Sequence, residues 1–323
     1  MKAALYDEAG GYYKRSDLER WGREGDYRTS PERSELFAAT FARYFARLYD
    51  ELGRPSQWTI VEAGAGRGDF AAGVLRGLQE QFPPIFQATR YVSIETSEEL
   101  EKLAPIEAGI FFSNELLDAF PVHRLTRTGD ELAELYIALN SDGRFVWSRG
   151  PLSTVRLDEF LREYSVELED GQIVEVNLEI DNWLSSVVSK LESGYVITVD
   201  YGAESCDLYD PALRPNGTLR AFSRHDFVDD VLAQPGDYDI TSSVNWSQVQ
   251  AVGTRLGLET VEFAPQDRFL INAGLLEELA REMNRLTSDA DKLALSTGAR
   301  EMILPGGMGS SFQVLVQKKG FEA

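Results

Sequence analysis

One short run of glycines constrains the fold of this chain more than any other feature. Residues 62–69 read Glu-Ala-Gly-Ala-Gly-Arg-Gly-Asp. The apolar stretch Trp58–Glu62 predicts a buried strand, and the residues after the run, to about residue 81, predict a helix. Glycines let the backbone adopt positive φ and let a ligand approach the main chain closely. Because ligands of open α/β sheets bind beyond the carboxyl ends of the strands, this turn predicts a nucleoside cofactor site.

The spacing of the glycines narrows the class of cofactor. A dinucleotide fingerprint needs a glycine where Asp69 stands, and there is no Gly-Lys-Ser/Thr of a triphosphate-binding loop. The acid-x-Gly-x-Gly-x-Gly pattern resembles the first motif of class I S-adenosylmethionine (SAM) methyltransferases. SAM carries a cationic sulfonium and an amino-acid tail in place of a pyrophosphate, and we expect Glu62 to help hold that polar end. The expected cofactor-binding residues of the turn are Gly64, Ala65, Gly66 and Gly68.

An acidic residue ends the next predicted strand. The run Tyr91–Glu95 is short and apolar, with Glu95 last. An acid at this place can accept hydrogen bonds from both hydroxyls of a ribose, which favours Glu95 as a cofactor residue. The alternative is a surface or capping acid, because Thr96 and Glu99 form a capping-box pair for the helix that follows.

Strands and helices alternate along the rest of the chain. Further strands are predicted at 109–113, 195–200 and 312–317, and a hairpin at Asp142-Gly143. This alternation predicts an α/β fold with a mostly parallel sheet whose faces are covered. The expected class is a Rossmann-like class I SAM methyltransferase core with an antiparallel last strand, an inserted hairpin and a helical and loop lobe.

We expect a single methyltransferase domain over residues 1–323. Residues 1–55 would form an arm and a helix that cover the cofactor site, residues 56–202 and 246–323 the core sheet with its helices, and residues 203–245 and 264–300 insertions on the substrate side. Ser30 can cap the first long helix, with Pro31 at its first position. Its core-facing residues are expected to be Leu36, Phe37, Phe41, Tyr44, Phe45, Leu48 and Leu52.

Composition restricts the partners and the location. The net charge is -21, which disfavours binding to nucleic acid and to anionic lipid, although acidity also serves solubility. One cysteine and two histidines allow no internal disulfide and no zinc-type cluster, so we expect no metal. There is no stretch of about 18 apolar residues and no secretion signal, so we expect a cytoplasmic protein without a membrane span. A homodimer is an arrangement common among soluble proteins.

Two acids follow the third predicted strand, in the segment Phe-Ser-Asn-Glu-Leu-Leu-Asp-Ala-Phe-Pro-Val-His at 112–123. If the turn after Asn114 is helical, Glu115 and Asp118 share a face, because residues i and i+3 are neighbours. Such a pair can bind a guanidinium or an ammonium group and orient its nitrogen toward a methyl group. The alternative is that the two acids stabilise a helix N-terminus. His123 is a candidate general base or a structural hydrogen-bonding residue.

The same segment resembles the Asn-Glu-hydrophobic-hydrophobic-Asp-Ala-hydrophobic-Pro-Val-His signature of the MidA family of SAM-dependent methyltransferases. Residues 25–32 resemble the family's N-terminal Gly-Asp-aromatic-x-Thr-Ser-Pro-Glu, and residues 199–202 match its Asp-Tyr-Gly strand end. Further resemblances follow in chain order at 217–222, 235–241 and 307–312. The family includes bacterial proteins and mitochondrial complex I assembly factors, which are associated with symmetric dimethylation of an arginine.

The resemblance implies a seven-strand SAM fold with insertions and methyl transfer to a side-chain nitrogen of a protein substrate, with arginine the expected acceptor. It supports Glu115 and Asp118 as catalytic candidates. An N-terminal segment is expected to fold over the cofactor. The cofactor candidates carried over are Thr29, Ser30, Pro31, Gly64, Gly66, Gly68, Glu95 and Asn114.

The chain also departs from the family pattern. Ala65 stands where relatives usually have proline, and Gln313 where a lysine is common. The stretch between Glu95 and Asn114 is shorter than in relatives, so we expect one sheet strand to be absent or vestigial and the adenine contacts to differ. This departure favours an alternative function, a catalytically degenerate protein of the same fold that acts as an assembly or interaction factor. A nicotinamide-dependent enzyme is disfavoured by the glycine spacing.

Overall fold

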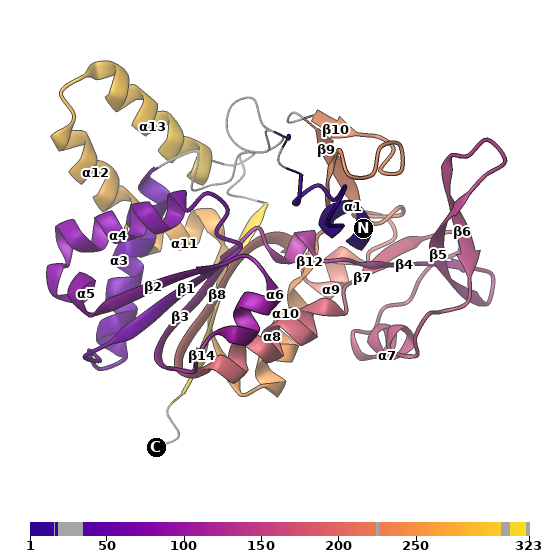
Figure 1. Cartoon of the computed structure of the whole chain (residues 1–323), viewed down its shortest axis with the longest axis horizontal. Coiled ribbons are helices and arrows are strands. Elements are labelled where there is room, and N and C mark those ends of the chain that lie inside the picture. The colour runs from indigo at the N-terminus through magenta and orange to yellow at the C-terminus, as the bar shows by residue number, and fades with distance from the viewer. Residues whose placement is uncertain (16, 19–34, 224–225, 305–310, 321–323) are drawn as a thin grey trace. The chain divides into compact units, whose positions relative to one another are not determined.

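The computed structural model describes residues 1–15, 17–18, 35–223, 226–304 and 311–320. The chain folds into two compact units (Figure 1). The expected single domain with its substrate-side insertions stays a prediction, and the expected helix start at 30–31 lies outside the described residues. The N-terminal unit comprises Met1–Arg28, Leu117–Asn182 and Gly202–Ala251; the C-terminal unit comprises Thr29–Leu116, Trp183–Tyr201 and Val252–Ala323.

The C-terminal unit is built on the central sheet, whose strand order is β13-β14-β8-β3-β1-β2, with β12 (Val244–Asn245) paired to the last residues of β8. The strands are β1 (Trp58–Ala63), β2 (Thr89–Ile94), β3 (Ile106–Asn114), β8 (Leu191–Ala203), β13 (Leu258–Pro265) and β14 (Phe312–Lys319). The helices are α3 (Glu35–Glu51), α4 (Asp69–Gln81), α5 (Pro83–Ala88), α6 (Ser97–Lys102), α11 (Gln266–Ala273), α12 (Leu275–Arg285) and α13 (Asp289–Ile303).

The strand directions confirm the expected fold class. Strands β1, β2, β3 and β8 run parallel, whereas β14 is antiparallel to both β8 and β13. Strand β2 has a neighbour on one side only, and residues 95–105 contain α6 in place of a strand. The strand that we expected to be absent is therefore absent from the described part of the chain, and β2 forms an edge of the sheet.

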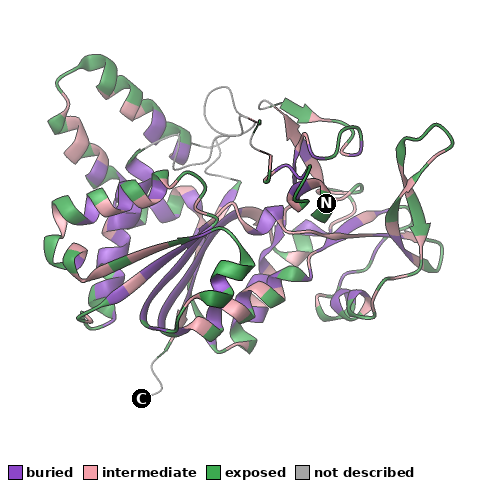
Figure 2. Cartoon of the chain, in the orientation of Figure 1, coloured by how far each residue is buried: buried purple, intermediate pink, exposed green. Residues whose placement is uncertain are grey.

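Aromatic side chains pack α3 and α4 onto the sheet. The ring of Phe70 on α4 stacks on Phe112 of β3 with centroids 4.2 Å apart, and Phe41 of α3 lies edge-on to the same ring at 5.0 Å. The two helices approach closely, because a Cβ on Gly73 would lie 2.5 Å from the Cβ of Ala38. All the apolar residues that we expected on the core side of α3 are buried (Figure 2).

The N-terminal unit contains two smaller antiparallel sheets. One has the order β6-β5-β4-β7, with β4 (His123–Thr128), β5 (Glu131–Leu139), β6 (Phe145–Gly150) and β7 (Ile173–Val176). The other has the order β10-β9-β11, with β9 (Arg220–Ser223), β10 (Asp226–Val228) and β11 (Asp239–Thr241). The pairing of β5 with β6 confirms the expected hairpin. The helices of this unit are α1 (Lys2–Tyr6), the 3-10 helix η1 (Leu117–Ala119), α7 (Arg156–Glu163) and α9 (Ser205–Leu208). Two more helices, α8 (Glu179–Lys190) and α10 (Trp246–Arg255), begin in this unit and end in the C-terminal unit.

Three local features differ from the sequence-based expectations. Pro83 and Pro84 follow α4 and also open α5, because proline is favourable at the first position of a helix. Helix α8 ends at Lys190 and β8 begins at Leu191, earlier than the strand expected at 195–200. Strand β13 was not expected from the sequence; it is a partly exposed strand at the edge of the sheet, with an irregular register near Thr260.

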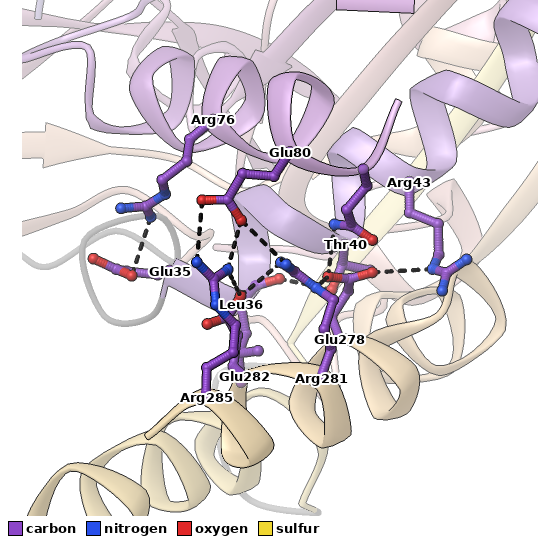
Figure 3. A network of polar contacts seen from close by, with 11 residues as sticks. Glu35, Leu36, Thr40, Arg43, Arg76, Glu80, Glu278, Arg281, Glu282 and Arg285 are labelled. Atoms are coloured by element: carbon purple, nitrogen blue, oxygen red, sulfur yellow. Dashed lines mark hydrogen bonds and ion pairs between the residues drawn. The ribbon is translucent and has the colours of Figure 1, made fainter. Parts of the chain in front are cut away.

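A buried carboxylate ties α12 to α3 and α4 (Figure 3). Glu278 of α12 is fully buried and accepts hydrogen bonds from Arg43 Nε of α3 at 3.1 Å and from Gln81 Nε2 of α4 at 3.0 Å. Arg281 Nε donates to the same carboxylate at 2.9 Å, and Arg281 also pairs with Glu80. A charged carboxylate is tolerated away from water only with such partners, so these contacts fix α12 within the C-terminal unit.

We predict that Glu278→Ala lowers the free energy of unfolding by about 2–4 kcal/mol, because it removes the shared acceptor of three donors. Chemical denaturation followed by circular dichroism measures this change. The matched control is Glu277→Ala, at the exposed neighbouring position of the same helix, which should change stability by less than about 0.5 kcal/mol. Equal effects of the two variants would contradict a stabilising role for the buried cluster.

Candidate cofactor and catalytic site

The glycine turn joins β1 to α4 and has an unusual backbone. Gly64, Gly66 and Gly68 have φ values of 72°, 55° and 78°, in the left-handed region that side chains disfavour. The N–H of Gly64 donates to the carbonyl of Ile94 at the end of β2, at 2.8 Å. A Cβ added at Gly68 would meet no atom within 4 Å, so open space lies beside the turn. The predicted cofactor loop is thus a tight cradle at the carboxyl ends of β1 and β2.

A buried acid lies under this cradle. Glu62 of β1 is 5% exposed and accepts a hydrogen bond from Tyr91 Oη of β2 at 2.9 Å. Burial raises the pKa of Glu62 to about 7; the hydrogen bond from Tyr91 opposes this, and the negative charges of Glu95 and Asp69 add to it. Three carboxylates therefore gather around the turn. Such a setting suits the cationic sulfonium and ammonium groups of SAM and disfavours a pyrophosphate.

Glu95 follows β2 directly and is exposed. The capping role belongs to Glu99, whose carboxylate accepts from the backbone N–H of Glu95 at 2.7 Å and of Thr96 at 3.1 Å. The expected capping box is confirmed at Thr96 and Glu99. The carboxylate of Glu95 stays at the carboxyl end of β2, where a ribose could be held.

Asn114 and Glu115 lie at the carboxyl end of β3, in the same unit as the glycine turn. The amide Nδ2 of Asn114 donates to Glu115 Oε1 at 3.0 Å, and the N–H of Glu115 donates to the carbonyl of Val199 at 2.9 Å. Glu115 has a φ of 52°, so the chain turns sharply there. The turn after Asn114 is not an α-helix, since only Leu117–Ala119 forms a short 3-10 helix. The condition under which Glu115 and Asp118 would share a helical face is therefore not met.

Asp118 belongs to the N-terminal unit and is buried. Its carbonyl accepts from the N–H of Ser242 at 2.9 Å. Burial, with the charges of Asp118 and Asp239, raises the pKa of Tyr6 far above its ordinary value. Tyr13 Oη donates to Asp239 Oδ1 at 2.8 Å. Sequence reasoning did not single out Asp239, although it lies in the stretch 235–241 that carries part of the family resemblance.

His123, at the start of β4, is held by a buried acid in the N-terminal unit. Its Nδ1 lies 2.7 Å from Glu134 Oε1 of β5. Glu134 Oε2 also accepts from the N–H of Ser153 at 2.6 Å and from Tyr136 Oη at 3.0 Å. Burial alone would raise the pKa of Glu134, but hydrogen bonds from His123 and Ser153 outweigh it, so the pKa is lowered. These contacts agree with a structural role, and a general-base role stays a prediction.

Comparison with known families decides the class of protein. Residues 40–104 and 100–264 match the family model described as "Putative S-adenosyl-L-methionine-dependent methyltransferase". The chain belongs to this family. SAM is therefore the cofactor, and the protein is a SAM-dependent methyltransferase, as we expected from the glycine turn.

Named relatives match nearly the whole of this methyltransferase. It is 25% identical to the Danio rerio "Protein arginine methyltransferase NDUFAF7, mitochondrial" over 97% of this chain and 81% of that protein. The Homo sapiens protein of the same name is 24% identical over 97% of this chain and 77% of its own length. These names agree with the resemblance to the MidA family found in the sequence.

Solved structures support the fold and the cofactor. One is a COG1565 superfamily protein from Burkholderia thailandensis, crystallised with S-adenosyl-homocysteine, which is 26% identical to this chain. The two structures align with a TM-score of 0.83 over 100% of this chain and 87% of that protein's chain. A native structure of a COG1565 protein from the same organism has a TM-score of 0.80 and is also 26% identical, over 100% of this chain and 86% of its own. None of the helices described for our chain has the length and apolar character needed to cross a membrane. The cofactor candidates Thr29, Ser30 and Pro31 lie outside the described residues.

We predict that Glu62 makes stability depend on pH. Its native pKa of about 7 exceeds the ordinary 4.5, so between these values the folded state binds more protons than the unfolded state. The wild type should therefore lose about 3 kcal/mol of stability, relative to Glu62→Gln, as the pH rises through this window. Urea denaturation of both proteins at intervals from pH 4.5 to 8 measures the difference. Parallel stability curves for the two proteins would contradict the raised pKa.

The glycine cradle gives a second prediction. Gly66→Arg should abolish binding of S-adenosyl-homocysteine, because it adds a large side chain to the glycine cradle and strains a residue with a φ of 55°. Isothermal titration calorimetry measures the affinity. The control is Gly53→Arg, which has a similar φ of 80° but open space around it and no place in the predicted site. Retained binding in Gly66→Arg, or equal loss in both variants, would contradict the assignment.

Proposed function

We propose that this methyltransferase transfers a methyl group from SAM to a guanidinium nitrogen of arginine in a protein substrate. The observation that carries the proposal is the agreement, over 97% of the chain, with relatives named protein arginine methyltransferases. The acidic residues at the carboxyl ends of the strands support it. A cytoplasmic location stays a prediction.

Glu115 is the first acid that we propose to hold the acceptor. Strand β3 pairs directly with β1, with Ser113 beside Ala63, so Glu115 follows the strand next to the glycine turn. The strand ends there, because Glu115 has a left-handed backbone whose N–H donates to the carbonyl of Val199. A carboxylate here offers two oxygens to the planar fork of a guanidinium, a match that an ammonium group lacks. Asp118, the second acid of the signature, belongs to the N-terminal unit, and its catalytic role stays a prediction.

The chemistry requires positioning more than activation. SAM supplies an electrophilic methyl group on a cationic sulfur. The acceptor nitrogen gains the N–C bond, the S–C electron pair stays with sulfur, and one N–H proton is released. The residues of this chain have to hold the nitrogen in line with the methyl group and keep water out. Carboxylates that accept from the other guanidinium N–H groups favour this alignment and stabilise the charge that the product retains.

The experiment identifies the methylated amino acid. The purified protein is incubated with methyl-tritiated SAM and cell-extract proteins, which are then hydrolysed and separated by chromatography. We expect label in methylated arginine. Label in lysine or in another amino acid would overturn arginine as the acceptor, and loss of all label in a protein that still binds S-adenosyl-homocysteine would favour a non-catalytic role.

We predict that the variant Glu115→Gln with Asp118→Asn lowers the turnover number at least about 100-fold, because neutral amides no longer attract the guanidinium charge. Its affinity for S-adenosyl-homocysteine should stay within about twofold of the wild type, since neither carboxylate belongs to the glycine cradle. The matched control is Glu107→Gln, an exposed acid at the opposite end of β3, which should leave turnover unchanged. Unchanged turnover in the double variant would remove both acids from the mechanism.

A further inference from the structure

The hairpin formed by β5 and β6 presents an apolar face to solvent. Its cross-strand register pairs Ile137 with Trp147 and Leu139 with Phe145. Residues directly opposite each other in an antiparallel pair project from the same side of the sheet, so these four side chains share one face. Ile137, Leu139 and Phe145 are 46%, 64% and 44% exposed. We call these four residues the hairpin face; the hairpin carrying it is visible in Figures 1 and 2.

The opposite face of the same sheet is already covered. Leu125 of β4 and Val174 of β7 pack there in a core formed with α7, and Leu132 of β5 lies against that core. Alternation along a strand places Leu132 on the side opposite to Ile137. The unit's own core therefore uses one side of the sheet only. Several large apolar side chains clustered on an exposed side are typical of an interaction surface.

The edge of this sheet is equally accessible. Strand β6 pairs with β5 and with no other strand of the described chain. Natural proteins protect such edges with charges, prolines or bulges. Strand β6 reads Phe-Val-Trp-Ser-Arg-Gly, with a single charge at Arg149 and no proline, and its register with β5 is regular. An edge of this kind is suited to receiving another strand.

The hairpin is also held rigid. The guanidinium of Arg124 lies 4.5 Å from the ring centroid of Trp147, and Arg124 Nε donates to Glu175 Oε1 at 2.9 Å. At the turn, Asn140 Oδ1 accepts from the backbone N–H of Asp142 and of Arg144. A preorganised surface loses little conformational entropy on binding.

We propose that the hairpin face and the free edge of β6 bind a second copy of this chain, by antiparallel pairing of the two β6 strands about a two-fold axis. Placing Trp147 on the axis puts Phe145 opposite the second copy's Arg149 and Val146 opposite its Ser148. The one charged residue of each strand then lies opposite an aromatic residue and never opposite its own symmetry mate, while Arg149 Nη1 donates to Thr128 Oγ1 of its own chain at 2.5 Å. The apolar faces of the two hairpins become continuous across the axis.

Charge restricts where on the surface a second copy can bind. Two chains that each carry a net charge of -21 repel one another over most of their surfaces. Association therefore requires a contact without acidic residues, and residues 145–150 contain none. The hairpin face adds aromatic and aliphatic groups and the edge adds backbone hydrogen bonds, which is the composition of a stable interface core.

The first test measures the mass of the protein by light scattering after gel filtration, at about 50 µM, where a specific dimer of micromolar affinity is populated. We expect twice the chain mass of 36.1 kDa for the wild type. Leu139→Glu should shift the protein to monomer, with the dissociation constant raised at least about tenfold. The matched control is Leu213→Glu, because Leu213 is 65% exposed in the same unit but lies outside the hairpin. Circular dichroism verifies that both variants fold.

The second test examines the strand pairing itself. In a Cys206→Ser background, Trp147→Cys should cross-link two chains under mild oxidation, because the two-fold axis brings the two Cβ atoms together. Arg149→Cys should not cross-link, because its symmetry mate would lie about 14 Å away along the strand. A monomeric wild type, or a dimer that Leu139→Glu leaves intact, would overturn the proposal. A wild-type monomer that loses only methyl transfer in Leu139→Glu would instead assign the hairpin face to the protein substrate.

Discussion

The stacking of Phe70 on Phe112 is the contact on which the geometry of the site depends. Phe70 is in the first turn of α4, just after the glycine cradle, and Phe112 lies two residues before Asn114 on β3. One aromatic contact thus fixes the loop proposed to hold the cofactor and the strand end proposed to hold the acceptor in the same frame. The close approach of α3 at Gly73, one turn further along the same face of α4, adds to this packing. Catalysis by alignment needs such a frame, because small displacements of the reacting atoms reduce the rate strongly.

Local patterns in the sequence predicted the features that depend on neighbouring residues. The apolar run before the glycines, the capping box at Thr96 and the turn at Asp142-Gly143 each specify their own structure, and each is confirmed. Features set by distant residues could not be predicted in this way. Strand β13 depends on its pairing with β14, and the left-handed Glu115 depends on an acceptor at Val199, far along the chain.

The same distinction between local and distant causes applies to the residues of the candidate site. The glycine turn was predictable because its backbone conformation and its cofactor-binding character both depend on residues within one short stretch of the chain. The raised pKa of Glu62 was not, since it results from burial and from the charges of two residues on other segments, Glu95 and Asp69. Asp239 was overlooked for a related reason, because only the fold shows that its carboxylate and that of Asp118 both act on Tyr6. Recognition of the family supplied what single residues could not, namely the expectation that the chain has one strand fewer than its relatives between Glu95 and Asn114.

The Glu278 cluster has a consequence for how the C-terminal unit opens. Its carboxylate accepts hydrogen bonds from donors on α3, α4 and α12. Separating α12 alone from the unit would therefore leave a charged group without its partners and would break hydrogen bonds to two other helices. The amide hydrogens of α12 should therefore exchange with solvent only when α3 and α4 also loosen, as one cooperative block. Although α12 lies far from the glycine turn in the sequence, the exchange rate of its amide hydrogens would measure the stability of the helices that pack beside that turn.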